Sequence, residues 1–273
     1  MITIEDVTTG AHYAGLVDLP IVVHSSLRSF GCVEGGADTV IDGLLELGCT
    51  VVVPTFTYDF RLQPPCGQRL ARNGWRYDDT LLGMRSDVFS PARNYISPEM
   101  GVIPSALLRR PNRTRSSHPA NSMAALGPLA NEIIDTQTYL DVYGPFQKVA
   151  ELGGKFVLMG VGLTSLTAIH LAEKLSGREL FRRWAKGTTG ELIEIAVGSC
   201  SGGFDSLNDS IEPIESTVIV GDSCWRVLPA ELALCRFTDA ISREPAITHC
   251  KSPKCQRCPD AIAGGPILAE ARG

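Results

Sequence analysis

Residues 20–53 read PIVVHSSLRSFGCVEGGADTVIDGLLELGCTVVV, and the order of patterns within this stretch decides the fold class. PIVVH at 20–24 and TVVV at 50–53 are short apolar runs that predict two buried strands. Residues 37–48, between them, place their apolar side chains on one helical face and end at a glycine. A strand, a helix and a strand in this order are typical of a parallel βαβ unit. We therefore expect an α/β fold with a mostly parallel central sheet and flanking helices.

The chain on the C-terminal side of this unit repeats the alternation of strands and helices. Apolar patterns predict helices at 101–109, near 146–152 and at 229–243, and strands near 113–117, at 155–162, near 191–197 and at 217–220. Residues 57–98 are rich in Pro, Gly, Arg and aromatic residues and show no period, so we expect a loop region inserted over the sheet. The predicted organisation is a single domain over 1–248, followed by a Cys-rich tail at 249–273.

Composition narrows the class of protein. Of 273 residues, 44% are hydrophobic and 20% charged, as in ordinary globular proteins, and the formal net charge of −5 argues against a nucleic-acid partner. No apolar run reaches the roughly 20 residues needed to span a bilayer. The N-terminus, MITIEDVTTG, lacks the pattern of a signal peptide, so we expect a cytoplasmic protein without a membrane partner. The oligomeric state stays open.

Polar side chains or glycines follow several of the predicted strands. His24-Ser25-Ser26, Thr55-Phe56, Ser116-Ser117-His118 and Gly160-Val161-Gly162 each come directly after an apolar run. Ligands of open α/β sheets bind outside the carboxyl ends of the strands, so we expect a site at this edge. GVGLTS is not a dinucleotide fingerprint, and G-x-S-x-G is absent, which counts against nucleotide binding and against an α/β-hydrolase.

Four segments together resemble one known family. HSSLRSFGCVEGG at 24–36, VVPTFTY at 52–58, RSSHPANSMAALGP at 115–128 and GVGLTSLTAIHLAE at 160–173 are similar, in order and spacing, to the aminoglycoside 3-N-acetyltransferases. The resemblance implies a family-specific acetyltransferase fold, antibiotic resistance as a role, and direct transfer of acetyl from acetyl-CoA to an aminoglycoside amine without a metal. Two alternatives stay open. The acceptor could be an amine intermediate of natural-product or polysaccharide biosynthesis, or the chain could bind CoA or an amine without turnover.

His170 is the candidate general base. Taken alone, a histidine in an apolar helical run is either a satisfied core residue or a base, and the resemblance places the catalytic histidine of the family at this position. A carboxylate should orient the ring and stabilise its charged form. We expect Asp205 in that role, with Glu173, three residues after the histidine, as the alternative.

The resemblance also implies where CoA binds. Its pantetheine arm would follow Ser25, Ser26, Leu27, Thr55 and Phe56, and its phosphates would lie near Arg113, Arg115, His118 and Ser122. The arginines could equally be solvated surface residues. His24 would contact substrate or coenzyme, or else bond to backbone at the end of its strand. On the acceptor side, Asp59, Asp78, Asp79 and Glu99 could attract a polycation or be loop carboxylates without a role.

The C-terminal cysteines form a separate feature. HCKSPKCQRC at 249–258 spaces Cys250, Cys255 and Cys258 as C-x4-C-x2-C, which is a competent part of a structural zinc site. The fourth ligand could be His249, Cys224 or Cys235. Free or redox-labile thiols and an iron–sulfur cluster are the alternatives. A zinc ion here would pin the tail.

Overall fold

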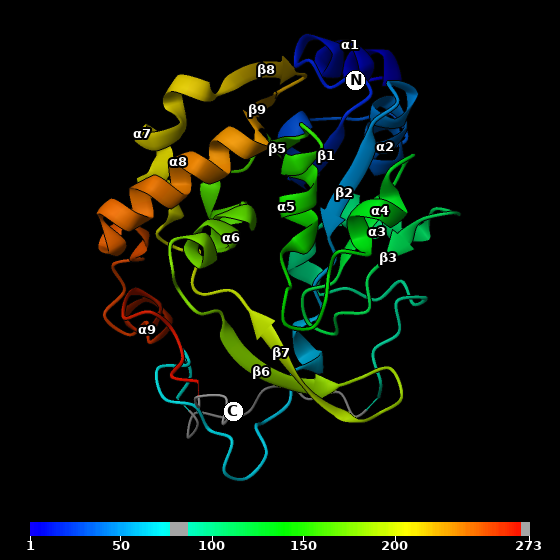
Figure 1. Ribbon diagram of the computed structural model, residues 1–273. Coiled ribbons are helices and arrows are strands. Elements are labelled where there is room, and N and C mark those ends of the chain that lie inside the picture. The colour runs from blue at the N-terminus through cyan, green and yellow to red at the C-terminus, as the bar shows by residue number, and fades with distance from the viewer. Residues whose placement is uncertain (77–86, 269–273) are drawn as a thin grey trace.

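A seven-stranded sheet with helices on both faces organises the chain, in strand order β3-β4-β2-β1-β5-β9-β8 (Figure 1). The structure is a computed structural model and describes residues 1–76 and 87–268. At its centre β1 (Pro20–Ser25) pairs in parallel with β2 (Thr50–Pro54) and with β5 (Lys155–Met159). The α/β class, with a central sheet and flanking helices, is confirmed.

The outer strands of the sheet run antiparallel to their neighbours. On one side β4 (Met123–Leu126) pairs with β2, and the two-residue β3 (Thr114–Arg115) pairs with β4. On the other side β9 (Ser223–Pro229) pairs with β5, and β8 (Ser216–Val220) pairs with β9. The parallel centre places the carboxyl ends of β1, β2 and β5 at one edge, as expected from the sequence.

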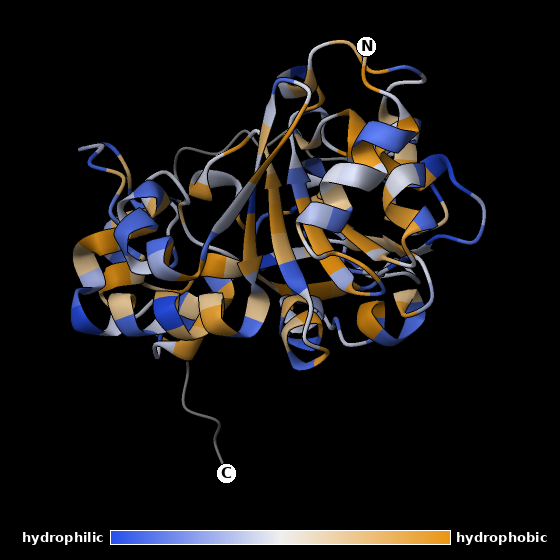
Figure 2. Cartoon of the chain, turned by 90° about the horizontal axis from the view of Figure 1, so that it is seen from above, coloured by the Kyte–Doolittle hydropathy of each residue, from blue (hydrophilic) through white to orange (hydrophobic). Residues whose placement is uncertain are grey.

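Side-chain alternation along the central strands builds two cores. Ile21 and Val23 point into one core, which packs against α1 (Ile4–Tyr13), α2 (Ala37–Glu46) and α3 (Val102–Arg109). Val22 points into the other, with α4 (Ala130–Ile134), α5 (Gly144–Glu151), α6 (Ala168–Leu175) and α8 (Ala230–Arg243). Because successive side chains enter opposite faces and both faces are covered, these strands read as unbroken apolar runs. Figure 2 shows the apolar strands enclosed by helices with polar outer faces.

The turn after β5 shows why the predicted strand at 155–162 ends early. Gly160 has a φ of 67°, in the left-handed region that favours glycine, and a Cβ there would overlap the Ser29 hydroxyl. The chain therefore leaves the sheet at Met159, passes through a 3₁₀ turn at Leu163–Ser165 and enters α6.

A second, smaller unit lies beside the carboxyl edge of the sheet. The ribbon of β6 (Phe181–Lys186) and β7 (Leu192–Val197) is separate from the main sheet, and α9 (Arg257–Ile262) and residues 57–76 lie on the same side of the molecule (Figure 1). Ala261 of α9 packs in one apolar cluster with residues of the ribbon. Within residues 1–76 and 87–268, no helix is both long and apolar enough to cross a bilayer.

Candidate active site

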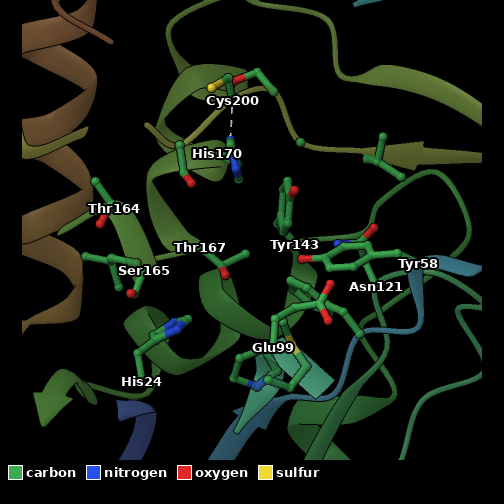
Figure 3. Close-up of a pocket in the computed structure, with 18 of the residues that line it drawn as sticks. His24, Tyr58, Glu99, Asn121, Tyr143, Thr164, Ser165, Thr167, His170 and Cys200 are labelled. Atoms are coloured by element: carbon green, nitrogen blue, oxygen red, sulfur yellow. Dashed lines mark hydrogen bonds between the residues drawn. The ribbon is translucent and has the colours of Figure 1, made fainter. Parts of the chain in front are cut away.

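A cavity of about 680 Å³ opens between the carboxyl edge of the sheet and the ribbon (Figure 3). Residues 23–25 of β1 and, at and after the end of β2, Pro54, Phe56 and Tyr58 form part of its wall, and residues of the turn at 161–167 continue it. The opposite wall comes from Arg183 of β6, residues 197–202 after β7, and Arg257 of α9. The predicted site at the strand ends is therefore a real cavity.

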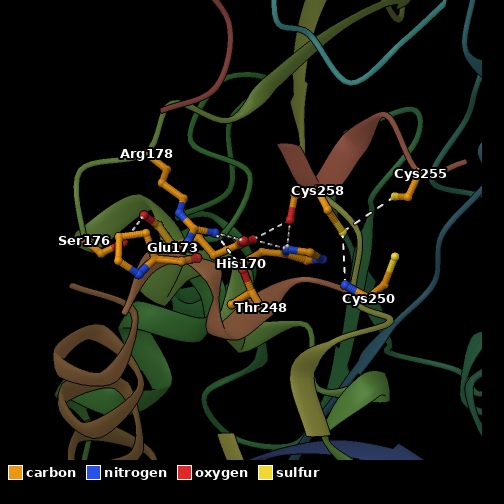
Figure 4. Close-up of polar contacts among 10 residues, drawn as sticks. His170, Glu173, Ser176, Arg178, Thr248, Cys250, Cys255 and Cys258 are labelled. Carbon is orange, nitrogen blue, oxygen red and sulfur yellow. Dashed lines mark hydrogen bonds and ion pairs between the residues drawn. The ribbon is translucent and has the colours of Figure 1, made fainter. Parts of the chain in front are cut away.

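His170 lies at the rim of this cavity and is held by Glu173. Its Nδ1 lies 2.7 Å from Glu173 Oε2, one turn further along α6 (Figure 4). A carboxylate accepts hydrogen bonds, so Nδ1 carries the proton and Nε2 is the nitrogen left for the cavity. This orientation is the one that a general base requires.

Glu173 is a buried carboxylate with several donors. Arg178 Nη1 lies 2.5 Å from its Oε1, and the Ser199 hydroxyl donates to Oε2 at 2.7 Å. Burial alone would raise the pKa of Glu173, yet the hydrogen bonds from His170 and Ser199 and the charge of Arg178 lower it below its ordinary value. Arg178 is itself fixed by Thr248 Oγ1, at 2.9 Å, and by the Pro245 carbonyl. The carboxylate therefore stays charged and fixed behind the imidazole.

Aromatic packing fixes the imidazole ring as well. Tyr143 stacks on His170 with ring centroids 5.9 Å apart, and Phe204 meets it edge-on at 4.9 Å. Gly198 closes the remaining side: a Cβ there would lie 2.5 Å from both His170 Cδ2 and the Tyr143 hydroxyl. Only glycine fits at this position without displacing the ring.

The far side of the cavity is formed by the ends of β1 and β2 and by the turn before α6. His24, Ser25 and Phe56 line it, and Figure 3 shows Thr164 and Ser165 across the cavity from Tyr58. Burial lowers the pKa of His24 to about 3, so its ring is neutral at physiological pH. Its buried Nε2 has no hydrogen-bond partner among the described residues. His24 is therefore not the backbone-bonded strand-end histidine that was one alternative.

Comparison with known proteins identifies the family. A family model described as aminoglycoside 3-N-acetyltransferase matches residues 22–193, which is more than half of the chain. The chain belongs to the aminoglycoside 3-N-acetyltransferase family. A relative from Salmonella sp, aminoglycoside N(3)-acetyltransferase III, is 34% identical over 170 residues, which are 57% of this chain and 54% of that protein. A relative of the same name from Serratia marcescens is 34% identical over 183 residues, 64% of this chain and 65% of that protein.

Solved structures extend the likeness to nearly the whole fold. The crystal structure of aminoglycoside acetyltransferase AAC(3)-IIb aligns with 26% identity and a TM-score of 0.72, over 89% of this chain and 98% of that one. AAC(3)-IVa, at 24% identity, aligns with a TM-score of 0.76 over 96% and 97% of the two chains and shows the shared fold. In sequence, the match spans about half the length of the first curated relatives.

Within this family fold, Asp205 is not the partner of His170. Asp205 is exposed, and its Oδ1 faces the Cα of Gly162, whereas its neighbour Phe204 touches His170. The expectation that Asp205 orients the imidazole is wrong, because Glu173 occupies Nδ1. Thr167, the residue before α6, makes no side-chain capping hydrogen bond and lines the cavity.

Arg115 is a structural residue and not an exposed phosphate ligand. Its guanidinium donates to the carbonyls of Thr55, Arg93 and Tyr95 at 2.8–3.0 Å. It also lies 3.2 Å from the hydroxyls of Thr55 and Ser122. Burial lowers the pKa of Arg115 to about 9, which still leaves it charged at neutral pH. The predicted coenzyme contacts at Arg115, Thr55 and Ser122 are therefore not supported, since their polar atoms satisfy one another.

Arg113 and His118, also predicted to contact the CoA phosphates, make their hydrogen bonds within the chain instead. Arg113 donates to the carbonyls of Leu108 and Ala92, at 2.6 and 3.0 Å. His118 is buried, with Nε2 3.2 Å from the Ala196 carbonyl and Nδ1 accepting the amide of Asn121 at 2.9 Å. Burial lowers the pKa of His118 to about 4, so the ring is neutral. It acts on the cavity indirectly, by fixing Asn121 in the wall.

The remaining predicted residues either do not line the cavity or lie outside the described part of the chain. Ser26 donates its amide to the Met159 carbonyl, and Leu27 packs against a core. Asp59 accepts the Tyr95 hydroxyl at 2.6 Å and does not line the cavity. Asp78 and Asp79 lie outside the described residues.

Several wall residues escaped the sequence analysis. Asn121, Tyr143 and Ser199 lie in segments without a catalytic motif, and only Asn121 falls within a family segment. Arg61 and Arg257 come from irregular or C-terminal segments that sequence alone could not place at the mouth. Glu99, proposed from sequence as an acceptor contact, does line the cavity.

The cysteine-rich segment meets a fourth cysteine from elsewhere in the chain. The Sγ atoms of Cys200, Cys250, Cys255 and Cys258 lie within 4.8 Å of one another. The expected fourth ligands do not join this group: His249 Nδ1 accepts the amide of Lys251 at 2.9 Å, and Cys224 and Cys235 are exposed outside it.

Proposed function

We propose that this chain is an acetyl-CoA-dependent N-acetyltransferase acting on an amine of an aminoglycoside, with His170 as general base. The observation that carries the proposal is the His170–Glu173 pair, fixed at the rim of the cavity with Nε2 left for a ligand. Family membership indicates the class of reaction, and the His170–Glu173 pair provides the general base that this reaction needs.

In the proposed reaction the amine attacks the thioester carbonyl directly. As the N–C bond forms, Nε2 of His170 takes the amine proton, and Glu173 stabilises the imidazolium. The C–S bond then breaks, the thiolate of CoA takes the proton from the imidazolium, and the products are the amide and free CoA. Thr164 and Ser165 lie in the turn that lines the cavity, and N–H and O–H donors of this turn would stabilise the oxyanion of the intermediate.

We assign each of the two ligands to one side of the cavity. CoA would enter along Ser25, where the family resemblance implies its pantetheine arm, and along the turn at 161–167. The acceptor would occupy the side formed by Tyr58, Glu99 and Asn121. One solved neighbour, AAC-IIIb at 23% identity, is described as a binary complex with CoASH, and another, at 24% identity, is described as a complex with a gentamicin.

The charge of the cavity lining favours a second acceptor class. Arg61, Arg183 and Arg257 line the cavity, with Glu99 as the single carboxylate among the described lining residues. Burial lowers the pKa of the Arg61 guanidinium, and the nearby positive charge of Arg257 acts in the same direction. Three cations against one carboxylate repel a polycationic acceptor and attract an anion. An amine that also carries a phosphate or carboxylate is therefore the alternative acceptor.

One experiment tests the proposed reaction. Release of CoA from acetyl-CoA is followed by thiol titration with gentamicin, glucosamine or glucosamine 6-phosphate, using the enzyme alone to blank its own cysteines. We expect acceptor-dependent release that falls by about 10²-fold or more in His170→Ala, with CoA affinity nearly unchanged. Unchanged turnover in His170→Ala would remove this residue from the mechanism, and no release with any acceptor would overturn the proposed function.

The same assay decides between the acceptor classes. Preference for glucosamine 6-phosphate over glucosamine, lost in Arg61→Ala and kept in the control Arg236→Ala on the exposed face of α8, would select the anionic amine. Preference for gentamicin, unaffected by Arg61→Ala, would select the aminoglycoside.

A further inference from the structure

Four cysteines from two distant segments converge beside the cavity, and one of them, Cys200, is part of its wall. Cys200 lies in the loop after β7 (Figure 3). Cys250, Cys255 and Cys258 lie in the segment that enters α9 (Figure 4). All four are free thiols, and Cys255 Sγ lies 3.5 Å from Cys258 Sγ, well beyond the length of a disulfide.

The spacing of the sulfur atoms fits a tetrahedral metal site. Four thiolates at about 2.3 Å from a Zn²⁺ ion lie about 3.8 Å from one another. The observed set, within 4.8 Å overall and with one pair at 3.5 Å, has this size. Thiolate ligands favour zinc over hard cations such as magnesium or calcium, and four protein ligands leave no open position for a substrate.

We propose that Cys200, Cys250, Cys255 and Cys258 bind one Zn²⁺ ion in a closed, structural tetrathiolate site. The C-x2-C pair of Cys255 and Cys258 at the start of α9 forms one half, and the backbone amide of Cys250 donates to Cys258 Sγ at 3.4 Å. Cys200 completes the set from a position about fifty residues earlier in the chain, which is why the local spacing did not identify it.

Two glycines allow the backbone segments that carry the cysteines to lie close together. A Cβ on Gly202 would lie 3.0 Å from Cys250 Cβ and 3.5 Å from Cys200 Sγ. A Cβ on the next residue, Gly203, would overlap the carbonyl of Thr248. The loop after β7 and the 248–250 segment therefore pack backbone to backbone, and the metal would join two segments that are already in contact.

The charge around the cysteines also suits a bound tetrathiolate. Four thiolates and one Zn²⁺ ion carry a net charge of about −2. Lys251, Lys254 and Arg257 lie within the same short segment and supply positive charge beside it. Arg257 adds a link to function, since it also lines the cavity.

The proposed zinc would hold two supports of the catalytic pair together. Ser199, next to Cys200, donates to Glu173, and Thr248, two residues before Cys250, accepts from Arg178. Both supports converge on Glu173 from the segments that the metal joins. The zinc site itself does not depend on the proposed function, but its expected effect on turnover rests on it.

The test starts with the metal content of the full chain. We expect about one zinc per chain by elemental analysis, released by a mercurial thiol reagent, and a Co²⁺-substituted form with the intense absorption of a tetrathiolate. Cys200→Ser should lose most of the zinc and lower the unfolding temperature. The matched control, Cys235→Ser, removes an exposed cysteine outside the group and should change neither.

Other results would overturn the assignment. A disulfide among the four cysteines found by alkylation and mass analysis, iron in place of zinc, or full zinc content in Cys200→Ser would each contradict it. If Cys200→Ser does not fold, Cys200→His, which keeps a zinc ligand, should fold and retain metal, and its failure to bind zinc would count against the site. Thiol release is measured in parallel, so an inactive protein that binds zinc contradicts the proposed function and leaves the zinc site standing.

Discussion

Glu173 shows how one buried side chain can organise an active site. It receives the imidazole of His170, the hydroxyl of Ser199 and the guanidinium of Arg178 in a space closed to solvent. Sequence suggested the histidine and offered Glu173 as its partner three residues on, a spacing at which two side chains of one helix can meet. The choice of Asp205 failed because residues 198–207, after β7, show no period from which the direction of a side chain could be predicted.

We expect Glu173→Gln to weaken catalysis and to change its pH dependence. Without the carboxylate the imidazolium of His170 is less stable, so kcat/KM should fall by at least about ten-fold and its acidic limb should move to lower pH. The measurement is the pH profile of kcat/KM, with Glu231→Gln on exposed α8 as control. A uniform loss without movement of the limb would show that Glu173 only supports the fold.

Gly198→Ala tests whether the position of the imidazole ring matters. The added methyl group would lie 2.5 Å from His170 Cδ2 and must push the ring or Tyr143 aside. A displacement of about 1 Å can cost about 10²-fold in rate, so we expect a large fall in kcat with CoA binding kept. A wild-type kcat in this variant would show that the cavity wall around residue 198 accommodates the methyl group without displacing His170.

At the scale of elements, the predictable part of the fold was the part with strong periodicity. The apolar runs of β1, β2 and β5 and the amphipathic pattern of α2 follow from burial on both faces of a parallel centre. The outer strands were harder: β4 reads MAAL, which has no strand preference, and β9 mixes polar and apolar residues in SCWRVLP. Only pairing with a central strand makes these segments extended.

Arg115 joins two segments of the chain, a structural role that sequence alone could not distinguish from binding a ligand. Its guanidinium ties residues 93–95 to the end of β2 through three carbonyls. We expect Arg115→Lys, which cannot reproduce the planar fork, to cost about 1–3 kcal/mol of unfolding free energy while leaving CoA affinity unchanged. Chemical denaturation and CoA titration measure the two effects, with exposed Arg109→Lys as control. Weaker CoA binding at unchanged stability would show that Arg115 contacts the coenzyme and does not serve the fold.

For the whole molecule, buried neutral histidines predict sensitivity to acid. The pKa values of His24 and His118 are lowered by burial from 6.5 to about 3 and about 4. The unfolded chain therefore takes up two protons as pH falls through 6.5, before the folded chain does, and stability present above 6.5 is lost on acidification. The lowered pKa of Glu173 adds a further loss only below its ordinary value of 4.5.

We expect the unfolding free energy to fall by up to about 2–3 kcal/mol per pH unit between about pH 6 and pH 4.5. Denaturant unfolding across this range measures the slope, and exposed His12→Gln should leave it unchanged. Constant stability from pH 6.5 to 4.5 would mean that both rings take protons while the protein stays folded.

The central place of β1 in the sheet has a consequence for biosynthesis. β2 follows β1 closely, but the strand on its other side, β5, begins only at residue 155. A nascent chain therefore exposes an unpaired, apolar strand edge for about half of its synthesis, and such edges promote aggregation. Fragments that stop before residue 155 should aggregate, and the ribosome-bound protein should require a chaperone on the open side of β1 until β5 emerges.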